Sequence, residues 1–193
     1  MYRHLTMEEL QVGLEEAGES PQDNGILEMI VSRPAIGERQ VVERADLHPI
    51  EGLIGDNWRT RGSPHTDDGS AHIEMQITIM NSRIIQLVAQ DRSRWPLAGD
   101  QLFIDLDLSV ENLRPGQHIA IGGAVLEITN MPHNGCAKFT ERYGHDAIRF
   151  VNSAEGRQLR RRGIYARVVQ PGVIHTGDRV SKVGIPESGF VDR

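Results

Sequence analysis

The sequence predicts a mainly β domain, built as a β-barrel or sandwich with helices at its periphery. About eight short strand-like runs carry this prediction, because each is rich in aliphatic residues and each ends at a turn signal. The predicted helices gather in two places, whereas a parallel α/β sheet needs helices that alternate regularly with strands. A regularly wound α/β fold is therefore excluded.

Length and composition are those of one folded domain. The chain has 193 residues, of which 38% are hydrophobic and 25% charged, so a core needs no disulfide or metal to support it. No apolar run approaches the roughly 20 residues of a membrane span, and residues 1–22 lack the layout of a secretory signal. We therefore expect no membrane association and a cytoplasmic location. The single cysteine excludes an intramolecular disulfide and a multi-cysteine metal cage.

The charge balance argues against nucleic acid as a partner. The chain carries 21 Lys and Arg against 27 Asp and Glu, a net charge of −6, while phosphate neutralisation needs a basic face. Aromatic residues make up only 5% of the chain, so recognition by base stacking is also excluded.

The N-terminal segment predicts a short helix over residues 6–17. Thr6 followed by Glu9 has the spacing of a capping box, and Leu10 and Leu14 share one face. A stretch of turn formers follows this helix and separates it from the first strand-like run. We expect three segments: an N-terminal helical arm and linker over 1–24, one β-barrel domain over 25–184, and a flexible tail over 185–193.

The strand-like runs differ in how clearly they alternate. Residues 101–108 alternate strictly, which places Leu102 and Ile104 on the buried side of a strand and Phe103 on the wet side. Gly122 and Gly123 predict a hairpin between two runs. The polar, Gly- and Pro-rich residues 59–71 are expected to form a long exposed loop. The other predicted strands cover 25–32, 40–46, 75–80, 117–121, 124–129, 164–169 and 179–183.

The predicted helices of the domain have recognisable ends. Asn81 is expected to cap a helix that runs through Gln90, and Ser153 is expected to cap one over 154–162 that Gly163 ends. Two further helices are predicted over 136–143 and 146–152.

Cys136 lies where the sequence changes from strand to helix. Its approach, Pro-His-Asn-Gly, is polar and rich in turn formers, and Asn134 or Gly135 is expected to cap the helix that begins near it. A thiol in a first helical turn is favoured as the thiolate, and Lys138 and Arg142 add positive charge nearby. Such a thiolate could act as a nucleophile, a persulfide carrier or a soft metal ligand, with His133 as base or hydrogen-bond partner. The alternative is that Cys136 is a small, inert, buried hydrophobe, and composition and spacing leave the two about even.

Several short motifs between Ser93 and Lys182 resemble the MOSC domain, a family named for the C-terminal domain of molybdenum-cofactor sulfurase. An upstream element, Gly52-Leu-Ile-Gly-Asp56, also resembles the family, so the likeness spans about residues 25–183 and is strongest to small bacterial stand-alone members. The matching pieces are Gly99-Asp100, Asp105-Leu-Asp-Leu-Ser109 with Asn112-Leu113, Pro132-His133, Gly135-Cys-Ala-Lys-Phe139, Arg142-Tyr-Gly144, Arg162-Gly-Ile-Tyr-Ala-Arg-Val-Val169 and Gly177-Asp178.

The resemblance implies a β-barrel with a cleft built around the cysteine. It further implies binding of molybdenum cofactor (molybdopterin), sulfur carriage on the cysteine, or reduction of N-hydroxylated compounds through cysteine-ligated molybdenum. Cys136 matches the family cysteine and is the expected catalytic residue and metal ligand. The histidine that often follows Gly-Asp in larger relatives is Asn57 here. A sulfurase domain that uses pyridoxal phosphate does not fit in 193 residues, so we expect no pyridoxal phosphate in this chain alone. The expected cofactor-binding residues are His133, Asn134, Lys138, Arg142, Arg162, Arg167 and Asp56.

Other residues suggest weaker alternatives. Arg157, Arg160 and Arg161 could clamp a phosphate, but a solvated, cationic helix end explains them as well. Aspartates after glycine are more often turn residues, with Asp56 the best exception. The eight histidines show no helical zinc spacing, and a Cys136/His133 hydrolase would lack an identified third group.

Two functional alternatives remain beside a molybdenum enzyme. One is a non-catalytic module that passes sulfur or molybdopterin to a partner protein. The other is a barrel in which Cys136 only fills space. The expected partner proteins of the chain are a redox protein or a sulfur donor. The sequence defines neither the substrate nor the oligomeric state.

Overall fold

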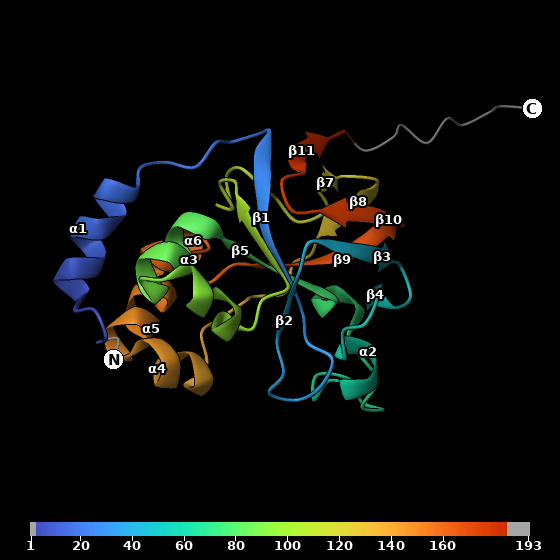
Figure 1. The fold of residues 1–193 in the computed structure, drawn as a ribbon, viewed down its shortest axis with the longest axis horizontal. Helices are drawn as coiled ribbons and strands as arrows, with labels where there is room; N and C mark the ends of the chain where they lie inside the picture. Colours follow the sequence, from blue (N-terminus) through green and yellow to red (C-terminus); the bar gives the residue numbers. More distant parts are fainter. Residues whose placement is uncertain (1–2, 185–193) are drawn as a thin grey trace, which may run out of the picture.

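The protein is a closed β-barrel with helices packed on one side, as a computed structural model of residues 3–184 shows (Figure 1). The barrel closes because the first strand pairs with the last, through Gly25 with Val180 and Ile26 with Arg179. One further strand, β2 (Gln40–Val42), extends the sheet beyond β1. The barrel strands are, in order around the ring, β1 (Gly25–Ser32), β11 (Arg179–Val183), β7 (His118–Ile121), β8 (Ala124–Ile128), β9 (Ile164–Gln170), β5 (Ile77–Asn81) and β6 (Leu102–Asp105).

The barrel interior is filled by aliphatic side chains that alternate along the strands. In β8, Ala124, Leu126 and Ile128 are fully buried, while the residues between them are partly exposed. This period of two is what a sheet with one dry face requires. The same aliphatic interior includes Leu27, Ile30, Ile77, Ile79, Leu102, Ile104, Ile119, Ile121, Ala166 and Val180. The predicted mainly β barrel with peripheral helices is confirmed, although helix and strand content are about equal.

A second apolar cluster joins the outside of β6 to the helices. Phe103 is fully buried there, with its ring 5.7 Å from that of Trp95 in η2 (Arg92–Ala98). The expectation of a wet side at Phe103 is therefore wrong, because helices cover the outer face of this strand. The helices are α3 (Ser82–Ala89), α4 (Ala137–Tyr143), α5 (His145–Asn152) and α6 (Ala154–Gln158).

Helix α1 (Met7–Ala17) packs against α3 and α5, and its Leu10 is fully buried. The predicted capping box is confirmed, because the Thr6 side chain accepts from the Glu9 N–H while the Glu9 side chain accepts from the Thr6 N–H. The predicted tail over 185–193 lies outside the described residues. No helix within residues 3–184 combines the length and the apolar character that crossing a bilayer demands.

Beside the barrel lies a small sheet of β10 (Gly172–His175), β3 (Arg44–His48) and β4 (Gly52–Leu53). The chain then passes through α2 (Trp58–Arg61) and a short 3-10 helix, η1 (Ile73–Met75). The predicted loop over 59–71 is therefore wrong at its start, where α2 forms.

Three predicted elements have different bounds in the structure. The predicted strand over 101–108 is observed as β6, and the predicted strand over 40–46 divides into β2 and β3. The predicted helix over 154–162 ends at Gln158, since Arg160 adopts a left-handed φ of 49°. Ser153 and Asn81 do cap their helices as predicted.

Candidate functional site

The loop between β8 and α4 carries His133 into the space beside the start of β9. The imidazole stacks on Tyr165 with ring centroids 4.4 Å apart, and the His133 side chain is only 7% exposed. Gly163 makes this approach possible. A Cβ at Gly163 would collide with the carbonyl oxygen of Ile79 and lie 3.3 Å from His133 Nδ1, and its φ of 105° disfavours other residues.

Behind His133 lies a buried ion pair between Asp100 and Arg162. Arg162 Nη1 donates to Asp100 Oδ2 at 2.7 Å and Nη2 donates to the Ala98 carbonyl at 3.1 Å. The Arg162 guanidinium also stacks over the Phe139 ring, 5.1 Å from its centroid. The other carboxylate oxygen, Asp100 Oδ1, lies 3.8 Å from His133 Nδ1. Neither atom has a hydrogen-bond partner among the described residues.

Burial controls the protonation of this group. It lowers the pKa of His133 well below the usual value, and the nearby Arg162 and Arg33 lower it further, so the imidazole is neutral at pH 7. Burial also raises the pKa of Tyr165, which therefore stays a phenol. For Asp100, burial raises the pKa, and the opposing effect of Arg162 offsets only part of that rise. The Arg162 guanidinium stays protonated and donates to Asp100 Oδ2 at 2.7 Å, so this oxygen of the carboxyl group acts as a hydrogen-bond acceptor.

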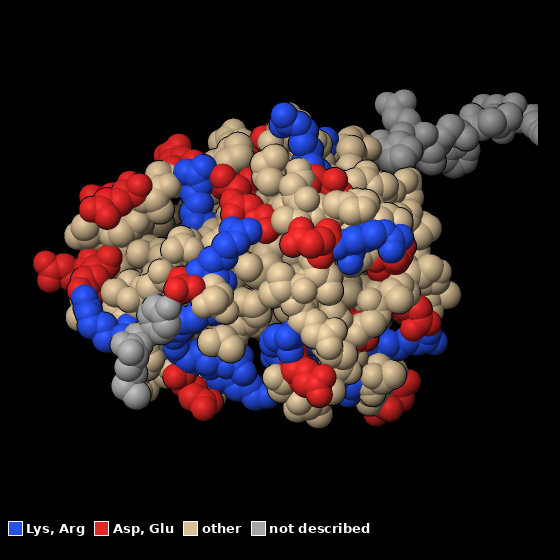
Figure 2. Space-filling model, viewed as in Figure 1, with Lys and Arg blue, Asp and Glu red and all other residues tan. Residues whose placement is uncertain are grey.

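A cavity of about 310 Å³ opens on the same side of His133 as α2. Its walls include Arg33, Arg61 and His65 as well as His133 and Tyr165. Figure 2 shows Lys and Arg side chains on both sides of a hollow at the lower edge of this face, between the regions that hold α4 and α2. We call this cavity and its rim the cationic cleft.

Arg33 and Arg61 line the cationic cleft, and Arg39 reaches its rim beside Gly99, but the three arginines differ in how they are paired. Arg33 is buried and forms a bidentate pair with Asp56, at 2.8 and 2.9 Å. Arg61 and Arg39 form no ion pair with an acidic side chain anywhere in residues 3–184. Burial lowers the pKa of Arg39, and the neighbouring Arg142 and Arg33 lower it further. These cations repel one another, and a bound anion would relieve that repulsion.

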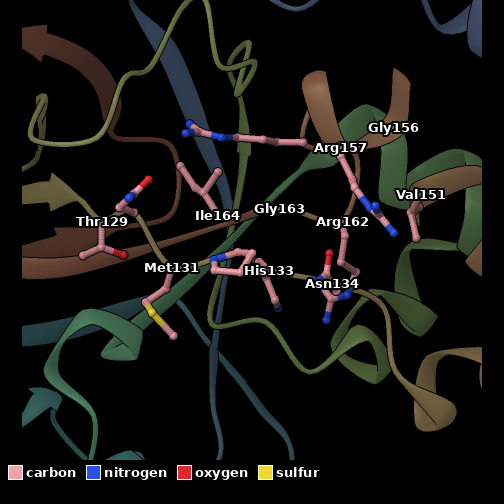
Figure 3. A pocket seen from close by; sticks show the side chains of 13 residues that line it. Thr129, Met131, His133, Asn134, Val151, Gly156, Arg157, Arg162, Gly163 and Ile164 are labelled. Carbon is pink, nitrogen blue, oxygen red and sulfur yellow. The ribbon is translucent and has the colours of Figure 1, made fainter. Parts of the chain in front are cut away.

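A second cavity, of about 210 Å³, lies on the other side of His133. Figure 3 shows it from close by, with His133, Gly163 and Arg162 among the labelled residues that line it. Asn134 and Arg157 also line it. His133 thus contributes to the walls of both cavities.

Cys136 is exposed and is the N-cap residue of α4, and within residues 3–184 its side chain makes no capping hydrogen bond. The interpretation of Cys136 as a buried hydrophobe is therefore wrong. The expected cap by Asn134 or Gly135 is also wrong, since the helix begins one residue later. The Gly135 peptide is held by Asn152, which accepts from the Gly135 N–H at 2.9 Å and donates to its carbonyl at 3.3 Å. This clamp on α5 sets the position of Cys136, although Cys136 lines neither cavity.

The structure brings only some of the expected site residues together. His133, Asn134 and Arg162 line the second cavity. Lys138 is exposed on α4, and Arg142 on the same helix donates to the Leu97 carbonyl.

Two other expected binding residues are engaged in ion pairs. Arg167 pairs with Glu127 at 2.9 Å, on the outside of the barrel. The side chain of Asp56 is fully enclosed against Arg33 and also accepts from the Trp58 N–H, so it holds the loop before α2 in place.

Sequence reasoning missed Arg33, Arg39, Arg61 and Tyr165, and it treated Asp100 as a turn residue. Arg33 and Arg39 stand in a stretch without regular pattern, and Arg61 stands in a predicted loop. The only available signal was Tyr165, which lies inside the Arg-Gly-x-x-Ala-Arg element.

The family model for the MOSC domain matches residues 63–181. The chain belongs to the MOSC domain family. The match covers the His133 loop, Cys136 and the segment from Arg162 to Arg167, but it begins after Arg33, Arg39 and Arg61. No curated protein matches the chain.

Solved structures share the fold at low sequence identity. YuaD from Bacillus subtilis superimposes with a TM-score of 0.62 at 17% identity, over 81% of this chain and 94% of that one. YiiM from Escherichia coli gives a TM-score of 0.54 at 15% identity, over 83% and 70%. YiiM from Geobacillus stearothermophilus gives 0.51 at 14% identity, over 86% and 75%. At these identities the likeness establishes the architecture and leaves the chemistry to the site.

Proposed function

We propose that this protein binds a molybdopterin-type cofactor at the cationic cleft, with the Cys136 sulfur as its metal ligand or as a sulfur carrier. The observation that supports this is the gathering of Arg39 and Arg61, without acidic partners in the described chain, in a protein of net charge −6. Unpaired guanidinium groups are the usual partners of phosphate groups.

The residues present suit such a cofactor. Arg61 and Arg39 would hold its anionic part. Cys136 lines neither cavity, but it caps α4, the helix that brings Arg142 near Arg39, and its exposed thiol offers the soft sulfur that molybdenum prefers. When bound, the molybdenum would supply two-electron redox chemistry, including reduction of N-hydroxylated compounds. The protein's own contribution would be to orient the anion, to hold the Gly135–Cys136 turn through Asn152, and to keep His133 neutral.

The test is molybdenum content after expression in a host that makes the cofactor. We expect wild-type protein to retain molybdenum, and we expect Cys136→Ser and Arg61→Gln to lose most of it while remaining folded. Arg44→Gln is the matched control, because Arg44 is exposed and lines neither cavity. Equal molybdenum content in wild type and Cys136→Ser would contradict the proposed ligand.

A non-catalytic carrier is the alternative, and the exposure of Cys136 favours it, because a sulfur handed to a partner protein must be reachable. An assay on N-hydroxylated bases with a chemical reductant separates the two functions. Turnover by the molybdenum-loaded protein indicates an oxidoreductase. Loading without turnover, together with transfer of sulfur or cofactor to an acceptor protein, indicates a carrier.

A further inference from the structure

Two buried polar atoms face each other beside the cationic cleft, one on His133 in the wall of the cavity and one on Asp100 behind it. Asp100 Oδ1 and His133 Nδ1 are 3.8 Å apart, and neither makes a hydrogen bond within the described chain. Native proteins pair nearly all such atoms, so a facing pair of unsatisfied atoms calls for a physical account. A shift of about 1 Å would bring them to hydrogen-bond distance, and functional hydrogen bonds often shorten only when a ligand binds.

The proton that can join them belongs on the imidazole. Asp100 Oδ2 already accepts from Arg162 at 2.7 Å, which favours an ionised carboxylate with a free acceptor at Oδ1. A neutral imidazole has one N–H and one acceptor nitrogen. With Asp100 ionised, a proton on Nδ1 satisfies both buried atoms at once, whereas a proton on Nε2 sets two acceptors against each other.

We propose that Asp100 fixes His133 as the Nδ1–H tautomer, so that Nε2 offers a hydrogen-bond acceptor to the cavity and selects oxyanions that still carry a hydrogen. This inference rests on one part of the proposed function, namely that the cationic cleft binds an anion. His133 is then a specificity-determining residue, and Asp100 is a positioning residue that acts through it.

The two kinds of group in the cavity define the ligand class. Arg61 attracts negative charge, while an acceptor at His133 needs an O–H from the ligand. A protonated phosphoryl group provides both, from free phosphate or from a phosphomonoester. Sulfate has the same shape and more negative charge than a phosphate monoanion, but it leaves the buried acceptor unpaired, at a cost of about 1–3 kcal/mol.

The binding test uses inorganic phosphate, methyl phosphate and sulfate at pH 6, by calorimetry. We expect phosphate or methyl phosphate to bind about tenfold more tightly than sulfate. The tighter of the two phosphates identifies the free anion or the ester as the source. In His133→Phe, which keeps a ring against Tyr165, the preference over sulfate should fall to within about twofold. Sulfate binding as tightly as both phosphates in wild type would overturn the inference.

The tautomer is tested directly by nitrogen NMR of histidine-labelled protein at pH 8.5, where histidines are neutral. His133 should show a protonated Nδ1 and an unprotonated Nε2, its signals being identified by their loss in His133→Phe. His118 is the internal control, because its Nε2 lies 3.3 Å from Glu127 Oε2 and should carry the proton instead. A protonated Nε2 on His133 would overturn the inference.

Asp100→Asn separates positioning from packing. The new amide can still accept from Arg162 and can donate to His133 Nδ1, so the tautomer should invert, as it does when the aspartate of a catalytic triad becomes asparagine. If Asp100→Asn fails to fold, the nitrogen NMR spectrum of the wild type and the binding of phosphate, methyl phosphate and sulfate still test the inference. Failure of molybdenum binding with the expected tautomer contradicts the proposed function alone, and molybdenum binding with the other tautomer contradicts this inference alone.

Discussion

The barrel interior and the cationic cleft are built on opposite principles. Inside the barrel, buried aliphatic side chains from each barrel strand pack against one another. Next to it, Arg33, Asp100, His133 and Arg162 are buried. They lie near Arg39 and Arg61, which have no acidic partner within residues 3–184. Burying such groups costs free energy unless they are paired, so the cleft cannot be explained as a source of stability. The comparison indicates that the barrel supplies the stability and the cleft supplies the chemistry.

The sharpest test of this division is Arg162→Met, since Arg162 stands at the boundary. Removing it leaves the Asp100 carboxylate buried without a partner, which should cost about 3–5 kcal/mol in the free energy of unfolding. Urea denaturation at pH 7 measures this. Arg162→Met combined with Asp100→Leu should recover much of the loss, since both charges are then gone. A double variant no more stable than Arg162→Met would show that the pair itself stabilises the fold.

Leu126→Ala tests the other side of the comparison. Leu126 is fully buried in the barrel interior, and its truncation should cost about 2–5 kcal/mol through lost burial and a residual cavity. Anion binding at the cleft should be unchanged under conditions where the variant is folded. Val169→Ala, on an exposed strand position, is the control and should change stability by less than about 0.5 kcal/mol. A large loss of anion affinity in Leu126→Ala would show that anion binding at the cleft depends on packing in the barrel interior, and would contradict the division between the two regions.

The pH dependence of stability should reveal His133. Its pKa is lowered in the folded protein, so below about pH 6.5 the unfolded chain binds more protons than the folded one. The free energy of unfolding should therefore fall with decreasing pH, by up to about 1.4 kcal/mol per pH unit from this one group. Urea titrations at pH 7.5, 6.5 and 5.5 measure the slope. His133→Phe should flatten it, while His145→Gln controls for the loss of one exposed histidine. Equal slopes in wild type and His133→Phe would contradict the burial argument.

Cys136→Ser should have the smallest effect on stability. Cys136 is exposed and makes no side-chain hydrogen bond at the helix cap, so the unfolding free energy should change by less than about 0.5 kcal/mol. Thermal denaturation, with Phe139→Ala as a buried comparison on the same helix, checks this. A loss above 1–2 kcal/mol would place Cys136 with the packed part of the molecule instead.

The strands and helices were predictable where a local pattern exists. The alternation around Leu102 and Ile104, the Gly122-Gly123 hairpin and the caps at Thr6, Asn81 and Ser153 all act within a few residues. Phe103 shows the limit, because its burial depends on helices that only the fold brings against β6.

The site was predictable only in part, for the same reason. The resemblance identified His133, Cys136 and Arg162. The pairing of Arg33 with Asp56, the facing of Asp100 and His133, and the approach of Arg39 to Arg142 join residues far apart in the chain. Patterns of residue spacing in the sequence cannot predict contacts between residues that only the tertiary fold brings together.

The closure of the ring through β1 and β11 has a consequence for how the protein is made. Gly25 leaves the ribosome early but finds its hydrogen-bond partner only when Val180 has been synthesised. Until then β1 has one edge open, and the chain must bring together two ends whose separation spans nearly the whole sequence, which slows folding. Nascent chains that stop short of β11 would therefore present an unpaired strand edge to the crowded cell, where chaperones and proteases compete for it.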